Sequence, residues 1–167
     1  MRHNSAKNIA LGGVMAALAL VVMCLGGLIP LATYVCPMFC AVLLMVVLKM
    51  TGGRVAWAWY GAVSILSMLL GPDKEAAAVF VFLGYYPILK PWLDRRKLAI
   101  LWKLVLFNVA IFAMYGVLIY VFGLAELAAE FRELGMILTV VTLVLGNATL
   151  FMMDVLLTVL EKRKFHG

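Results

Sequence analysis

Charged residues are scarce in this sequence, and that scarcity decides the class of protein. Only 13% of the 167 residues are charged and 66% are hydrophobic, whereas soluble domains average about 25% charged and about 45–50% apolar. A globular domain with this composition could not cover its own core with polar side chains. The sequence therefore predicts an all-α integral membrane protein. Its net charge of +6 is assigned to membrane topology, with no nucleic-acid partner.

Catalytic and metal-binding groups are also missing. The two histidines, His3 and His166, are terminal, and the sequence has no Gly-rich phosphate loop, zinc motif or paired carboxylates. Membrane hydrolases and transferases need such groups to activate water or hold phosphate. We expect no enzyme activity, no cofactor and no metal. The three cysteines, which all fall in apolar surroundings, are expected to pack as small hydrophobic side chains: Cys24, Cys36 and Cys40.

What the sequence does have is a series of long apolar runs. Crossing the hydrocarbon core takes about 20 residues, and Gly and Pro residues divide the chain into runs near that length. The first run exceeds the 7–15 residues typical of a signal peptide, so it is interpreted as a retained span. We expect one integral membrane domain, residues 1–167, with six spans at about 8–29, 34–50, 55–71, 76–92, 98–122 and 134–160.

The distribution of basic residues predicts the orientation of these spans. Of the 14 lysines and arginines, all but Lys74 and Arg132 fall on the side that also holds both termini, and loops rich in Lys and Arg lie in the cytosol. Both termini are therefore predicted to be cytosolic, in a bacterial cytoplasmic membrane. The tryptophans all lie near predicted cytosolic ends, where an interfacial belt is expected: Trp57, Trp59, Trp92 and Trp102.

Polar residues inside the predicted spans are the candidates for function, because the membrane interior makes them costly. Asp154 in the last span is the most costly of these residues to place in a membrane. Lys90 or Arg54 could be its partner in a structural ion pair. We prefer this interpretation to contact with a substrate. Asn147, seven residues earlier on nearly the same helix face, is a candidate for an interhelical hydrogen bond or for ligand contact. Asn108 is expected to be structural.

The segment from Gly71 to Lys97 predicts a broken helix. Pro87 cannot donate to the carbonyl of Leu83, and a carbonyl freed inside a membrane needs a neighbour, water or a ligand. Tyr85 and Tyr86 fall at mid-depth, where broken helices form transporter binding sites; a kink filled by packing is the alternative. In the outer turn Asp73-Lys74-Glu75, the acids are expected to cap the next helix, and the role of Lys74 is left open.

The first span carries a stripe of small residues that a neighbouring helix could approach closely. The stripe consists of Ala6, Ala10, Gly13 and Ala17, and Gly12, Ala16 and Ala19 widen it. Its partner could be internal to the bundle or a second protein. Because the stripe begins at the predicted cytosolic end, it suits docking of a second protein there.

Taken with the topology, these residues resemble a known family. Six spans, cytosolic termini, the start "AKNIA" (Ala6 and Ala10) and the segment "GPDKE…GYYPILKP" resemble the substrate-binding S components of energy-coupling-factor vitamin importers. The resemblance implies capture of a vitamin-like solute from outside, with the first outer loop "PLATY" as a lid. It also implies docking on a transmembrane coupling subunit that two cytosolic ATPase subunits drive. Metal-importing members of that family present an extracellular N-terminal Met-His, whereas "MRHN" lies on the predicted cytosolic side here. The resemblance therefore implies that nickel and cobalt are not the substrates.

On this hypothesis the substrate pocket lies in the outer half of the membrane. The candidate substrate-binding residues are Tyr34, Lys74, Tyr85, Tyr86 and Asn147. Three alternatives stay open: an MreD-like structural membrane protein of the cell-shape machinery, a stand-alone secondary transporter and a small membrane enzyme. Transport without ATPase partners would identify the secondary transporter, and the missing catalytic groups rank the enzyme last.

Overall fold

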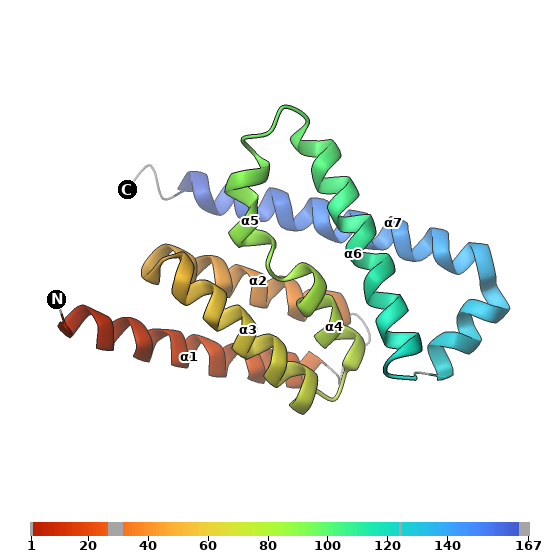
Figure 1. Ribbon diagram of the computed structural model, residues 1–167, viewed down its shortest axis with the longest axis horizontal. Helices are drawn as coiled ribbons and strands as arrows, with labels where there is room; N and C mark the ends of the chain where they lie inside the picture. The colour runs from red at the N-terminus through yellow and green to blue at the C-terminus, as the bar shows by residue number, and fades with distance from the viewer. Residues whose placement is uncertain (1, 27–31, 124, 164–167) are drawn as a thin grey trace. The chain divides into compact units, whose positions relative to one another are not determined.

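The computed structural model describes residues 2–26, 32–123 and 125–163. Every regular element in these residues is a helix (Figure 1). The chain divides into two compact units, Met1–Asp94 and Arg95–Gly167. The expectation of one integral domain stays a prediction, and each unit is described by itself below.

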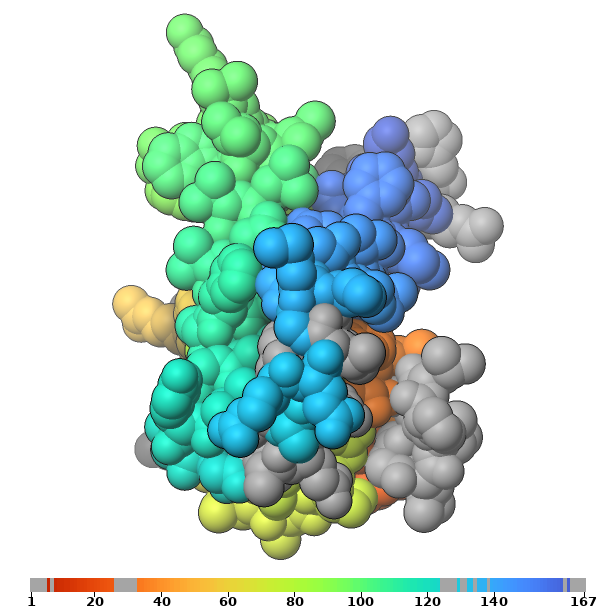
Figure 2. Space-filling model, turned by 90° about the vertical axis from the view of Figure 1, so that its right-hand side faces the viewer, coloured from red at the N-terminus to blue at the C-terminus, as the bar shows by residue number. Residues whose placement is uncertain are grey.

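The first unit contains five helices, and the second contains two. In the first, α1 (Arg2–Gly26), α2 (Ala32–Thr51) and α3 (Gly53–Leu70) lie side by side, and α4 (Lys74–Leu83) and α5 (Tyr86–Leu93) follow (Figure 1). In the second, α6 (Ala99–Tyr120) packs against α7 (Ala125–Arg163). Figure 2 shows α6, in green to teal, beside the blue part of α7.

Six helical segments of the described residues are long and apolar enough to cross a membrane, as the sequence predicts. They are Asn8–Leu25, Thr33–Thr51, Gly53–Leu70, Lys74–Leu93, Ala99–Tyr120 and Gly135–Leu160. Many large apolar side chains on these segments face outward, among them Ile9, Leu69 and Phe151, each more than 65% exposed. Water would penalise such a surface, whereas lipid tails accept it. The all-α, multi-pass class is therefore the one that the structure supports.

The core of the first unit is built where α1 to α4 meet. Small residues lie among the largest buried ones: Ala19 of α1 and Ala77 of α4 are at most 1% exposed, as are Leu44, Val63 and Phe80. Alternating small and large side chains lets neighbouring helices approach closely, which is how helices associate in lipid. Cys40 is part of this core, and its thiol lies 3.5 Å from the carbonyl oxygen of Ala19. The expected packing role fits Cys40.

The interpretation of the four tryptophans as one interfacial belt is wrong for Trp59. Trp57, Trp92 and Trp102 are about half exposed, but Trp59 is buried in the core. Its indole nitrogen donates to the carbonyl oxygen of Gly12 at 3.1 Å, and its ring meets the ring of Phe80 edge to face. The sequence places Trp57 and Trp59 on different faces of one helix, so both cannot face the same surface.

Residues 125–133 correct a second expectation, because they are helical where the sequence predicted a loop. The segment is rich in Ala, Glu and Leu, which favour helix, although its charges hide it from a hydropathy analysis. Gly135 then breaks α7 with φ 47° and ψ −117°. A left-handed φ is costly for residues other than Gly. The apolar part of α7 therefore begins at Gly135, and the preceding helical residues are an extension of it.

Candidate functional site

A cavity of about 200 Å³ lies between α6 and α7 in the second unit. Three polar residues line it, Lys103 of α6 and Asn147 and Asp154 of α7. The rest of the lining is apolar: Ile100, Leu104, Phe107, Leu150 and Phe151. An apolar wall with a few converging polar groups is typical of small-molecule sites. Of the five predicted substrate-binding residues, Asn147 alone lines this cavity.

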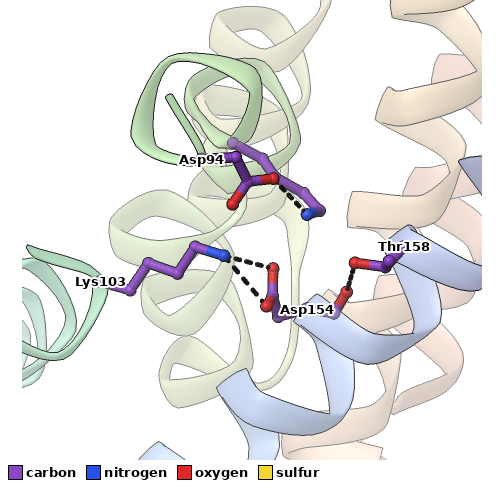
Figure 3. A network of polar contacts seen from close by, with 5 residues as sticks. Asp94, Lys103, Asp154 and Thr158 are labelled. Atoms are coloured by element: carbon purple, nitrogen blue, oxygen red, sulfur yellow. Dashed lines mark hydrogen bonds and ion pairs between the residues drawn. The ribbon is translucent and has the colours of Figure 1, made fainter. Parts of the chain in front are cut away.

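An ion pair forms the charged end of the cavity. The Lys103 Nζ lies 3.0 Å from Oδ1 and 3.1 Å from Oδ2 of Asp154, so one ammonium meets both carboxylate oxygens (Figure 3). The two side chains are 13% and 25% exposed. Asp154 thus forms an ion pair, as the sequence analysis preferred. Its partner is Lys103 of α6, whereas the sequence analysis had named Lys90 or Arg54. Thr158 donates to the backbone carbonyl of Asp154 one turn along α7.

Two asparagines form the second polar feature of the α6–α7 interface. Asn147 donates through Nδ2 to Asn108 Oδ1 at 3.1 Å and to the carbonyl oxygen of Leu143 at 2.8 Å, and Asn108 Nδ2 donates to the carbonyl of Leu104. A carbonyl oxygen can only accept, so these backbone contacts fix which way both amides point. The bonds of Asn147 use its two amide hydrogens. Its Oδ1 is therefore the group that it can offer to a ligand.

The two helices approach closely beside Asn147 because the preceding residue is glycine. Gly146 is buried, and a Cβ added to it would lie 2.6 Å from Cδ1 of Ile111 on α6. The side chain of Ile111 occupies the space that a side chain at position 146 would take. The close approach at this level, with larger side chains on the Lys103 side, leaves the cavity between the asparagines and the ion pair.

The helix break expected at Pro87 lies between α4 and α5 in the first unit. At Gly84, between the two helices, an added Cβ would overlap the carbonyl and ring of Phe80, so this position has no room for a side chain. The Tyr60 hydroxyl on α3 donates to the carbonyl oxygen of Val81 just before the break. A carbonyl near the break thus takes its hydrogen bond from a neighbouring helix, as the membrane requires.

The two tyrosines of the break have different surroundings. Tyr85 is partly buried, and its ring meets the ring of Tyr60 edge to face, with centroids 6.1 Å apart. Tyr86 is completely buried at the start of α5. These contacts fit the alternative interpretation of the break, in which packed side chains fill the kink. A substrate role for Tyr85 and Tyr86 stays a prediction.

The outer turn is a polar cluster that joins three helices. Asp73 caps α4 by accepting from the backbone nitrogen of Ala76 at 3.0 Å, and it also accepts from Thr33 of α2 at 2.8 Å. Tyr34 donates to Glu75 at 3.4 Å. The predicted capping role of Asp73 is confirmed.

Lys74 has a structural role in this turn. Its Nζ donates to the carbonyl oxygens of Met68 and Gly71, at 2.8 and 3.0 Å, where α3 ends. The last carbonyls of a helix have no partner within the helix, and a cation there also complements the helix dipole. Its predicted contact with substrate is untested. Pro30 and Leu31, which begin the expected lid "PLATY", lie outside the described residues.

The small-residue stripe of α1 is divided between two faces. Gly12 and Ala19 are buried and Ala16 packs against the core, so these residues form the internal helix contact. The other four are exposed and lie at the centre of the opposite face: Ala6, Ala10, Gly13 and Ala17. We call these four residues the outer stripe. No other described helix of the first unit covers them.

Lys103 is the functional candidate that the sequence analysis missed. It was counted among the cytosolic flanking residues because it lies only five positions after Leu98, where the span was expected to begin. The signal that could have identified it is its place inside an apolar run, together with one carboxylate in the next span. An intramembrane lysine and an intramembrane aspartate are expected to pair.

No known protein family, no curated protein and no solved structure matches this chain. Within the described residues, no group of three or more His, Cys, Asp or Glu side chains could hold a metal ion. The fold is that of a helical protein with six segments suited to crossing a membrane, and a small, mostly apolar cavity with three polar residues lies between α6 and α7.

Proposed function

We propose that this chain is a membrane-embedded solute-capture subunit that works with separate coupling and ATPase subunits. The S components of energy-coupling-factor importers, which the sequence resembles, work in this way. In this proposal both termini lie in the cytosol of a bacterial cell, and the solute is a vitamin or a similar small nutrient. ATP is hydrolysed on the partner chains.

The cavity between α6 and α7 is the observation that carries this proposal. It lies toward the ends of these two spans that the sequence predicts to be cytosolic, because Lys103 is near the start of α6 and Asp154 is near the end of Gly135–Leu160, and not in the outer half where the pocket was expected. It places a cation, a carboxylate and an amide oxygen in an otherwise apolar space between two helices suited to crossing a membrane. Charges within a membrane span are costly, and Lys103 and Asp154 both lie within segments suited to crossing a membrane. A chain that keeps two of them beside a cavity is expected to use them. Binding of a polar solute is the simplest such use.

The outer stripe on α1 supports the requirement for a partner. Four small residues in register present a flat face that no other described helix of the first unit covers. In lipid such a face associates with another helix through close van der Waals contact. We assign this face to the transmembrane coupling subunit.

The test is to purify the tagged full-length chain from its own cells in mild detergent and to measure the ATPase activity that accompanies it. We expect a complex with a membrane coupling protein and ATPases. Ala10→Trp should disrupt the complex because the larger side chain prevents close helix approach. Ala62→Trp is the matched control, since Ala62 is an exposed alanine on α3, away from the stripe.

Two results would contradict the proposal. One is a chain that carries no ATPase activity and accumulates solute when reconstituted alone in liposomes. The other is a complex with cell-wall synthesis proteins in place of ATPases, which would favour the structural role.

The ion pair favours a second candidate, a stand-alone secondary transporter. Paired intramembrane charges can couple solute movement to an ion or proton gradient, and Lys103 and Asp154 form such a pair beside the cavity. Accumulation in liposomes that depends on a proton gradient, with no ATPase present, would select this function.

A further inference from the structure

The lining of the α6–α7 cavity indicates which kind of solute it accepts. We propose that the cavity binds a small zwitterion, a molecule with one ammonium and one carboxylate group on a short apolar body. This inference rests on the proposed function, because it assumes that the cavity is a solute site. It adds the chemical class of the solute.

The first argument is charge balance. Lys103 and Asp154 neutralise each other, with the ammonium nitrogen 3.0 and 3.1 Å from the two carboxylate oxygens. A solute with a single charge would engage one of them and leave the other without its counter-charge inside an apolar wall, which is unfavourable. A zwitterion supplies both signs, so its carboxylate meets Lys103 while its ammonium meets Asp154. Only a solute of both signs can separate the pair without leaving a net charge behind.

The second argument concerns the amide of Asn147. Its hydrogen bonds to Leu143 and Asn108 use the two amide hydrogens, and its Oδ1 remains to accept. Asn147 lies seven residues, or about two helical turns, before Asp154, so the two residues are on nearly the same face of α7. Both line the cavity. Two acceptors on one wall suit a donor group such as an ammonium. The positive end of the solute is therefore placed along α7 and the negative end toward α6.

The third argument is size. Pockets for drug-sized ligands measure about 300–1,000 Å³, whereas this cavity holds about 200 Å³. The remaining lining is aliphatic and aromatic, including Phe107 and Leu150, which are almost completely buried. A solute of amino-acid size with an apolar side chain suits a space of this volume and lining.

The experiment compares matched chemical forms of the same body. The full-length protein in a nonionic maltoside detergent is titrated with a panel of zwitterions (leucine, methionine, phenylalanine, β-alanine and betaine), and binding is followed calorimetrically. For the best binder with a free amine, the N-acetyl acid, the amide and the N-acetyl amide give the anionic, cationic and neutral forms. We expect a zwitterion to bind at least about tenfold more tightly than each derivative.

The variant arm uses Lys103→Met combined with Asp154→Leu. Replacing both partners of a buried ion pair with apolar residues is commonly neutral for folding, and the unfolding temperature checks this. We expect the double variant to lose zwitterion binding at least about tenfold, while Lys49→Met, which removes an exposed cation of α2, binds as the wild type does. If the double variant fails to fold, the comparison of chemical forms on the wild type still decides.

Three results would overturn the inference: no zwitterion of the panel binds, the neutral form binds as tightly as the zwitterion, or a folded double variant binds unchanged. These results are separable from failure of the proposed function. ATPase-dependent uptake of a neutral solute would refute the zwitterion site and keep the capture subunit. Zwitterion binding by a chain that has no ATPase partners would support the zwitterion site and refute the capture subunit.

Discussion

The indole nitrogen of Trp59 donates to the carbonyl oxygen of Gly12 at 3.1 Å and so joins α3 to α1. Backbone carbonyls inside a helix already accept one hydrogen bond, and this one accepts a second from a side chain of another helix. A Cβ added to Gly12 would meet no other atom within 4 Å, so this bond does not depend on the residue being glycine. The bond holds α1 by its inner face and leaves the outer stripe turned away from the core.

Trp59→Phe should destabilise the protein by about 1–3 kcal/mol, because it removes this hydrogen bond and part of a buried ring. Trp57→Phe, on the exposed neighbour, should change stability by no more than about 0.5 kcal/mol. Reversible unfolding in mixed micelles measures both. Equal effects of the two substitutions would contradict the core position of Trp59.

Tyr60→Phe should destabilise the helix break between α4 and α5. The substitution removes only the hydroxyl that donates to the carbonyl of Val81, and an apolar surrounding offers that carbonyl no replacement. The expected cost is about 1–3 kcal/mol. Tyr120→Phe is the matched control, because Tyr120 is 89% exposed. If both substitutions prove neutral in the same unfolding assay, Val81 does not depend on Tyr60.

Asp73→Ala should loosen the start of α4, because it removes the cap on the Ala76 nitrogen and the acceptor for Thr33. Loss of such a cap costs about 0.5–2 kcal/mol. Asp73→Asn keeps a capping oxygen and should lose less. Hydrogen exchange at the amides of residues 74–77 reports the effect, with faster exchange in Asp73→Ala than in Asp73→Asn. Unchanged protection from exchange in Asp73→Ala would contradict the claim that Asp73 stabilises the start of α4 as its N-cap.

The sequence predicted the spans well because apolar runs and Gly or Pro breaks are local signals. All six predicted spans overlap helices suited to crossing a membrane, and the break near Pro87 is present between Leu83 and Tyr86. The errors arose where the local signal was mixed. Residues 125–133 carry charges that resemble a loop, yet their helix propensity is high, and only the left-handed Gly135 separates them from the span.

The candidate site was less predictable, because it depends on which faces meet. Asn147 and Asp154 could be placed on one face of a helix from their spacing, but the spacing could not show that Lys103 and Asn108 lie opposite on α6. From the sequence, Tyr34 and Lys74 were candidate substrate-binding residues on the same grounds as Asn147, namely their polar side chains. In the structure their polar atoms contact Glu75 and the end of α3. Side-chain partners between helices are set by packing, which hydropathy does not encode.

The most direct measurement for the central claim is to identify by mass spectrometry what the purified protein retains from an extract of its cells' growth medium. The account predicts that the wild-type chain enriches at least one small solute and that the variant with Lys103→Met and Asp154→Leu, folded to the same extent, does not. A wild type that enriches nothing, or a double variant that enriches the same solute equally, would contradict solute capture in the cavity between α6 and α7.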